Sequence, residues 1–196
     1  MPNSNKPNRK QQILEILARE LESNPGSRIT TAALAKAVGV SEAALYRHFS
    51  SKAKMFEALI DFAEESVFGL INKILNQESD VTLRCERILQ LLLGFSERNP
   101  GITRILLGDA LVGENERLRS RVGKFFERIE TQLKQVLREA NLSNGTRAAT
   151  SIDAAANLMM SYIEGRMSQF VRSGFEKQPT LHGDEQWPAM KIGLFK

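Results

Sequence analysis

The sequence is poor in the residues that build disulfides and metal centres. It has one cysteine, Cys85, and two histidines among its 196 residues. One cysteine cannot close an intramolecular disulfide, and a zinc site needs about four Cys or His ligands close together. We therefore expect no structural disulfide, no metal and no other cofactor. A chain with this cysteine content is expected in the reducing cytosol.

Long hydrophobic runs and catalytic motifs are lacking as well. No apolar stretch approaches the ~18 residues that span a membrane, and the start, MPNSNK, has no signal-peptide core. The sequence shows no nucleophile elbow, no glycine-rich phosphate loop and no metal-ligand cluster. Cys85 has only His48 and His182 as imidazole partners, and both are distant in sequence. These absences predict a cytoplasmic protein without membrane contact, and not an enzyme.

What the sequence does contain indicates an all-α fold. Apolar residues recur three and four positions apart, and alternating runs typical of strands are missing. Residues 1–8 are polar with two prolines and predict a loose arm, and residues 141–145 predict a turn. A short amphipathic end follows residue 183. The expected helices are 9–22, 30–38, 42–48, 52–76, 81–98, 100–110, 115–140 and 148–172.

Positive charge is concentrated at the N-terminal end. Residues 1–55 hold nine Lys and Arg against four Asp and Glu, a net of +5, whereas the rest of the chain has a net of −1. Such an asymmetry favours a polyanionic partner at that end. An ordinary solvated basic face is the alternative.

The stretch 31–49 fits a helix-turn-helix. Ala35 is small where the second helix would cross the first, Gly39 tolerates the positive φ of the turn, and Leu45 would lock the pair. In this motif the second helix enters the major groove of DNA. An ordinary helical hairpin is the alternative reading of the same pattern.

Polar and small side chains around this motif favour DNA as the ligand. Small residues at the start of helix 42–48 allow close approach to base edges, and its end carries donors for phosphate. The N-termini of helices can also bind phosphate through their free backbone N–H groups, and the N-terminal arm adds cations. Two alternatives to a DNA contact remain open: Tyr46 could be buried in the core, and His48 could cap the helix. The expected DNA contacts are Arg9, Lys10, Thr30, Thr31, Ser41, Ala43, Ala44, Tyr46, Arg47, His48 and Lys52.

The segment GVSEAALYRHFSSKAKMF resembles the signature of the TetR family. The segments LLLGFSERNPGITRIL, FERIETQLKQVLRE and FVRSGFEKQPT resemble the nucleoid occlusion factors of that family, over most of residues 9–187. The resemblance implies a TetR-like fold, with a helix-turn-helix DNA-binding domain at 7–67 and a regulatory and dimerisation domain at 68–196. It further implies a nucleoid-associated homodimer on palindromic double-stranded DNA. While DNA-bound, such a protein contacts the C-terminal tail of FtsZ and blocks division-ring assembly over the chromosome.

The resemblance also implies particular residues. Thr30 falls where the family needs a threonine for DNA binding, and Leu70 stands where an arginine is expected. Leu91, Gly94 and Arg98 share one helix face by their spacing. Gly94 inside a helix favours close approach of a peptide backbone, or of another helix. The residues implied for the FtsZ tail are Phe62, Leu91, Gly94, Arg98 and Asn99.

A ligand-responsive repressor is the alternative function. Helices 52–172 would then enclose a small-molecule pocket, for which Thr103, Arg104, Tyr162 and Glu164 are the few polar candidates. In either case we expect helix 148–172 and the C-terminal segment to form the dimer interface. The apolar stripe expected there comprises Leu158, Met159, Tyr162 and Phe170.

Overall fold

The computed structural model describes residues 8–142 and 146–196, so the arm expected at 1–8 lies outside it except for residue 8. Of the turn expected at 141–145, residues 143–145 lie outside the described part, and residues 141 and 142 are helical, so the helix expected to end at 140 runs two residues further. Within those residues the fold is all-α, with one isolated β-bridge between Ala148 and Phe195. The helices are α1 (Arg9–Ser23), α2 (Thr31–Val38), α3 (Glu42–His48), α4 (Lys52–Gln77), α5 (Val81–Arg98), α6 (Pro100–Leu106), α7 (Glu116–Leu142), α8 (Ile152–Arg172) and α9 (Gly183–Leu194).

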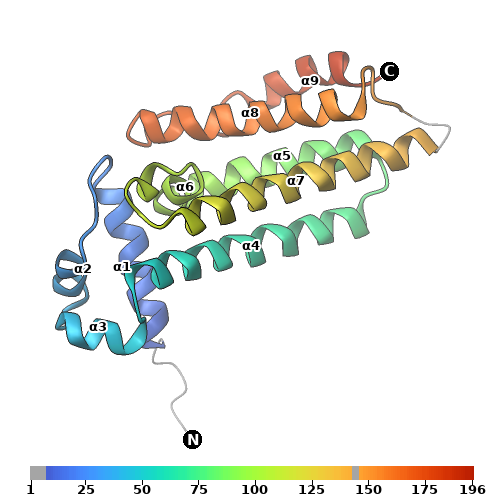
Figure 1. The fold of residues 1–196 in the computed structure, drawn as a ribbon. Coiled ribbons are helices and arrows are strands. Elements are labelled where there is room, and N and C mark those ends of the chain that lie inside the picture. Colours follow the sequence, from blue (N-terminus) through green and yellow to red (C-terminus); the bar gives the residue numbers. More distant parts are fainter. Residues whose placement is uncertain (1–7, 143–145) are drawn as a thin grey trace, which may run out of the picture.

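The helices form two parts joined by α4. Figure 1 shows α1, α2 and α3 gathered at one end, with the long α4 running from them along the rest of the molecule. Helices α5 and α7 lie beside α4, and α8 and α9 cover the side away from α4. Most of the buried apolar residues of α4, α5, α7 and α8 belong to one continuous core that also reaches α1–α3.

Helix starts follow local capping signals. Side chains that accept a hydrogen bond from the first turn begin α2, α3, α4, α5 and α8, which satisfies backbone N–H groups that a helix leaves unpaired. The expected bounds of the first five helices are confirmed to within about one residue. The capping side chains are Thr30, Ser41, Ser51, Asp80 and Ser151.

Two further expected helices are wrong at one end. Helix α6 stops at Leu106 instead of residue 110, because Gly108 has a φ of 79° and a 3₁₀ turn, Asp109–Leu111, follows. Helix α8 begins at Ile152 instead of 148. The backbone before it pairs with the C-terminus: the Ala149 N–H donates to the Leu194 carbonyl at 2.8 Å. Pairing between such distant segments leaves no local signal in the sequence.

A close backbone approach joins α1 to α6. A Cβ on Gly101 would lie 2.1 Å from the carbonyl oxygen of Ala18, so only glycine fits there. Arg104, 1% exposed, reaches across the same contact. Its Nη1 donates to the carbonyls of Leu21 at 2.6 Å and Asn24 at 2.8 Å, and its Nε donates to Asp109 at 2.5 Å. We call this set of hydrogen bonds the Arg104 clasp.

A second set of contacts joins the loop before α7 to the N-terminal part of the chain. The Glu114 side chain, 9% exposed, pairs with Lys52 at the start of α4 and lies 3.6 Å from Nε of Arg28. The carbonyl of Gly113 also accepts a hydrogen bond from Arg28. The N-terminal helices are therefore held to the rest of the chain at both the α1 and the α4 side.

Replacing Arg104 by alanine should destabilise the protein strongly. The change leaves the buried Leu21 carbonyl, the part-buried Asn24 carbonyl and the exposed Asp109 without their partner. Each buried acceptor left without a hydrogen bond costs about 1–3 kcal/mol. Urea unfolding at fixed protein concentration measures the free energy. The exposed Arg117, whose Nε lies 3.9 Å from Glu57, is the control. Arg117→Ala should cost less than about 1 kcal/mol. Equal stabilities of the two variants would contradict the clasp.

Candidate nucleic-acid interface and partner groove

Helices α2 and α3 form a helix-turn-helix with the geometry that the sequence predicts. Gly39 ends α2 in the left-handed conformation, at φ 74° and ψ 38°, and the next N–H, of Val40, donates to the Ala35 carbonyl at 3.0 Å. Ala35 and Leu45 are buried between the helices. The opposite side of α3 is thereby turned to solvent.

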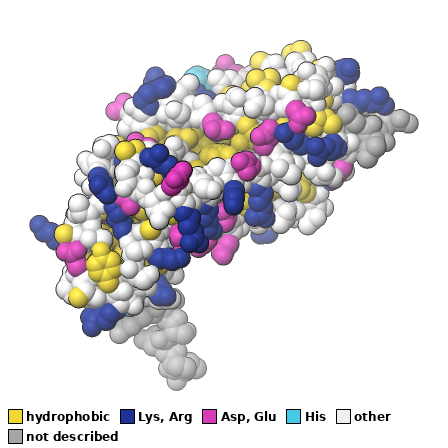
Figure 2. All heavy atoms as spheres, viewed as in Figure 1, with side chains coloured by type: hydrophobic (Ala, Val, Ile, Leu, Met, Phe, Trp, Pro, Cys, Tyr) yellow, Lys and Arg dark blue, Asp and Glu magenta, His cyan; other side chains and the backbone are white. Residues whose placement is uncertain are grey.

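The exposed side of α3 carries the polar residues expected to meet DNA. Tyr46 is 43% exposed, so its place in the core is excluded. Its hydroxyl makes no hydrogen bond among the residues that the structure describes. Ala43 and Arg47 are exposed beside it, while Ala44 and His48 are half-buried. Figure 2 shows Lys and Arg side chains around the end of the molecule that α1, α2 and α3 form.

Some of the residues expected to contact DNA already form hydrogen bonds within the protein. Thr30 and Ser41 accept hydrogen bonds from the backbone of Ala33 and Ala44, at 3.1 and 3.2 Å. The Thr31 hydroxyl donates to Glu42 at 2.8 Å, so a phosphate contact would require it to change partner. These three side chains shape the starts of α2 and α3 before they meet any ligand.

Lys52 points into the protein in this structure. Its Nζ donates to the Ile29 carbonyl at 3.0 Å, pairs with Glu114 and lies 5.8 Å from the centroid of the Phe56 ring. In this conformation Lys52 is paired with a carboxylate from the loop before α7, so a phosphate contact would require it to change partner, and its contact with DNA stays a prediction. The sequence held no signal for that loop's position.

The start of α1 lies beside the end of α3. Nζ of Lys10 is 5.9 Å from the centroid of Phe49, the residue that follows α3. The neighbouring Arg9 donates to Gln12 at 2.6 Å. The structure thus brings these two cations, expected on the arm, next to the helix-turn-helix.

The residues implied for a peptide partner lie in two groups. Phe62 on α4 is 49% exposed, with its ring 6.4 Å from that of Phe95. Asn99, which donates to the Phe95 carbonyl at 2.8 Å, lines a hollow of about 500 Å³ together with Phe62. Arg98 and Asn99 line a smaller hollow of about 220 Å³. We call these the Phe62 hollow and the Arg98 hollow.

Gly94 and Leu91 line neither of these hollows. Gly94 is buried, and a Cβ there would lie 3.2 Å from Nη1 of Arg98. The Arg98 side chain therefore lies across the position where an open backbone was expected. Leu91 is half-buried against the core. Leu70, at the position of the expected arginine, is exposed on α4 and also lines neither hollow.

Most of the polar side chains expected to line a small-molecule pocket are hydrogen-bonded to other groups of the protein. The Thr103 hydroxyl donates to the carbonyls of Ser96 and Asn99, at 3.1 and 3.0 Å. Arg104 belongs to the clasp, and the Tyr162 hydroxyl donates to Gln186 at 3.0 Å. Glu164 lines a hollow of about 510 Å³ between α6, α7 and α8.

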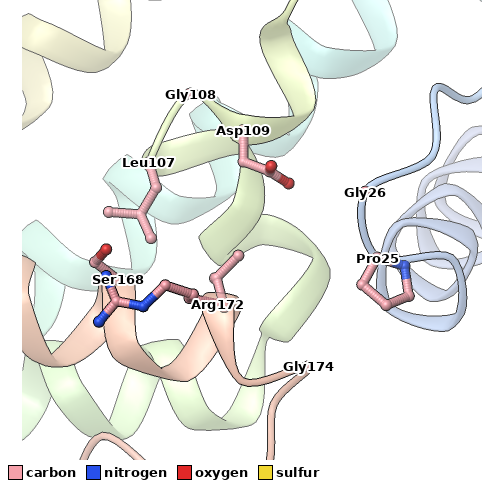
Figure 3. A pocket seen from close by; sticks show the side chains of 9 residues that line it. Pro25, Gly26, Leu107, Gly108, Asp109, Ser168, Arg172 and Gly174 are labelled. Carbon is pink, nitrogen blue, oxygen red and sulfur yellow. The ribbon is translucent and has the colours of Figure 1, made fainter.

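A further hollow, of about 740 Å³, lies at the junction of the two parts of the molecule. Figure 3 shows Pro25 and Gly26 on one wall, Asp109 on the second and Arg172 from the end of α8 on the third. Asp109 is held by Arg104. This hollow is therefore bordered by the clasp.

Cys85 has the environment of a core residue. It is fully buried in α5, and burial raises the pKa of its thiol to about 12. A thiol with that pKa is protonated at neutral pH and is a poor nucleophile. No group of three or more His, Cys, Asp or Glu residues is placed to hold a metal in the part of the chain that the structure describes. None of the described helices is long and apolar enough to cross a bilayer.

Two family models match this chain. Residues 13–59 match the bacterial regulatory proteins of the tetR family. Residues 79–194 match the tetracyclin repressor-like, C-terminal domain of SlmA-like proteins.

Curated relatives match the chain along its whole length. The nucleoid occlusion factor SlmA of Alteromonas mediterranea is 59% identical over 191 residues, which cover 97% of this chain and 98% of that protein. The nucleoid occlusion factor SlmA of Shewanella denitrificans is 58% identical over 196 residues and covers both chains completely.

Solved structures show the same fold at low identity. The MbdR regulator from Azoarcus sp. CIB superposes with a TM-score of 0.80 at 16% identity, over 95% of this chain and 99% of that one. The ketosteroid transcriptional regulator KstR2 of Mycobacterium tuberculosis gives 0.77 at 17% identity, over 98% and 97%. These likenesses concern the fold alone.

Tyr46→Phe should weaken DNA binding without changing stability. The substitution removes only a solvent-facing hydroxyl, and a hydrogen bond to a charged phosphate is worth about 1.5–3 kcal/mol, or roughly tenfold or more in affinity. Mobility shifts on a duplex selected from a random library measure the effect. Tyr162→Phe, the same change at the other tyrosine, is the control. Wild-type affinity in Tyr46→Phe would contradict the assignment.

Proposed function

The chain belongs to the TetR family, in its SlmA branch, and we propose that it is a nucleoid occlusion factor that binds specific chromosomal DNA and, while bound, engages FtsZ. In this proposal residues 7–67 bind the DNA, and residues 68–196 dimerise and present the partner groove. Full-length identity near 60% to proteins named nucleoid occlusion factor SlmA supports it.

DNA binding is supported by the chemistry of one surface. The exposed side of α3 offers Tyr46 and Arg47 as donors, and the start of α1 adds Arg9 and Lys10 close by. Donors and cations of this kind hold phosphates and fix the register of a protein on the duplex. A protein that neutralises six to ten phosphates loses about 10³–10⁵-fold in affinity between 50 and 200 mM salt, and we expect a similar fall here.

Dimerisation is proposed through the outer faces of α8 and α9. Met159 and Phe170 of the expected stripe are buried within the subunit, so they do not serve an interface. Leu158, also of the expected stripe, is exposed on α8, and Ile192 on α9 is 82% exposed. Two subunits related by a two-fold axis would present their α3 helices to half-sites about one DNA turn apart, ~34–36 Å.

The proposed FtsZ contact depends on the exposure of Phe62 next to the Arg98 hollow. A large aromatic ring half in solvent beside a hollow is the kind of anchor that peptide interfaces use. Arg98, at the end of α5, adds a cation for an acidic tail, and no ion pair holds it among the described residues. This observation carries the FtsZ part of the proposal.

Ile192→Asp should convert a dimer to monomers. In the dimer a carboxylate at this contact would have to be buried without a partner, which costs several kcal/mol. This cost exceeds the free energy that a single apolar side chain contributes to dimerisation. Sedimentation at micromolar concentration measures the mass. Val112→Asp, at an exposed position in the loop before α7, is the matched control. A dimer that survives Ile192→Asp would contradict the assigned interface.

Arg98→Asp should abolish binding of an FtsZ-tail peptide and leave DNA binding intact. The change replaces attraction by repulsion; because a hydrogen bond to a charged group is worth about 1.5–3 kcal/mol, we expect a loss of more than tenfold. Titration of labelled peptide beside a DNA mobility shift measures both. Lys124→Asp makes the same charge reversal on the exposed side of α7.

Two outcomes would argue against the FtsZ contact. Peptide affinity that is equal in Arg98→Asp and Lys124→Asp would place the tail elsewhere. If the wild type ignores the peptide while a small metabolite releases it from DNA, the protein is a ligand-responsive repressor instead.

A further inference from the structure

A carboxylate from the C-terminal part of the chain reaches the start of α4. Glu114 lies in the loop before α7, and its side chain is nearly buried. It pairs with Lys52, the first residue of α4, whose Nζ also donates to the Ile29 carbonyl at 3.0 Å. Nε of Arg28, which lies between α1 and α2, is 3.6 Å from the same carboxylate. One carboxylate outside residues 7–67 therefore faces two cations within them.

The backbone of the loop fixes the place of this carboxylate. Gly113, directly before it, has a φ of 75°, a left-handed conformation that favours glycine. The Gly113 carbonyl accepts a hydrogen bond from Arg28 at 3.4 Å. The N–H of Glu114 donates to the carbonyl of Leu111, which is anchored in the core, at 3.0 Å. The loop thus presents Glu114 to the start of α4 through several contacts, of which the ion pair is only one.

Lys52 lies where a DNA phosphate would otherwise be welcome. Helix α4 begins four residues after the end of α3, the helix proposed to meet the major groove. The first turn of α4 has the free N–H groups and the positive dipole end that favour an anion, and Lys52 adds a full charge there. To meet a phosphate, Lys52 must leave Glu114, which would then keep only Arg28 as a cation. A nearly buried carboxylate that loses its partner is destabilised.

We propose that Glu114 competes with the DNA backbone for Lys52, so that the C-terminal part of the chain lowers the DNA affinity of residues 7–67. This inference rests on the DNA-binding part of the proposed function and adds a regulatory residue to it. The wild type holds Lys52 back, and the affinity for a site is set by a carboxylate outside the DNA surface. A movement of the loop before α7 would release one further cation to the duplex.

Glu114→Gln tests the competition, because it removes the negative charge and keeps the size of the side chain. With Lys52 released, DNA affinity should rise by about fivefold or more, which is the equivalent of one ion pair. The plot of log affinity against log salt should also become steeper by about 0.9, the contribution of one further phosphate contact. Mobility shifts at several salt concentrations, on a duplex selected from a random library, measure both quantities.

Glu116→Gln is the matched control, and circular dichroism checks that every variant is folded. It removes the same charge two residues further on, where the carboxylate is exposed at the start of α7. Affinity should stay within about twofold of the wild type, because an exposed charge is screened by salt.

A double-mutant cycle identifies Lys52 as the cation that is released. Lys52→Gln should cost about fivefold or more in affinity when it is added to Glu114→Gln, because the free ammonium group then contacts phosphate. In the otherwise unchanged chain the same substitution should cost less than about threefold, since Glu114 already holds Lys52.

The possible failures are distinguishable. If Glu114→Gln and Glu116→Gln bind the duplex with equal affinity and equal salt dependence, DNA binding stands and the competition is overturned. If the wild type selects no duplex from the library, DNA binding and the competition are both overturned. If Glu114→Gln fails to fold, Lys52→Gln alone decides: a loss of more than about threefold overturns the competition, and a smaller loss supports it.

Discussion

The buried guanidinium of Arg104 is the interaction on which the rest of the arrangement depends. It joins α6 to the carbonyls at the end of α1 and to Asp109, over a contact so close that Gly101 cannot carry a side chain. Buried charges are stable only when paired and hydrogen-bonded, so these partners come as a set. The set holds α1 against α6, α2 packs on α1, and α3 packs on α2.

Because α1 is fixed in this way, it can serve two surfaces. Its first turn lies beside the end of α3 through Lys10, and its second and third turns line the Phe62 hollow.

Local signals in the sequence were enough for most of the helix bounds and for the helix-turn-helix. Gly39 and the caps Thr30 and Ser41 act on their own neighbours, so their spacing predicts the structure. Contacts between distant segments were not predictable, as when Glu114 pairs with Lys52. The spacing of Gly94 and Arg98 places them on one face of α5, but it does not show that the Arg98 side chain folds back over Gly94. Two of the four residues of the stripe expected on α8, Met159 and Phe170, are buried within the subunit for a related reason. Periodicity shows that a residue is apolar, but not whether it faces its own core, as Met159 does, or another copy.

We propose that one dimer holds DNA and the FtsZ tail together. Native mass spectrometry of the protein mixed with its selected duplex and an FtsZ-tail peptide tests this most directly. The account predicts a species that contains two subunits, one duplex and up to two peptides. Protein–DNA complexes that take up no peptide, or a peptide that displaces the duplex, would contradict it.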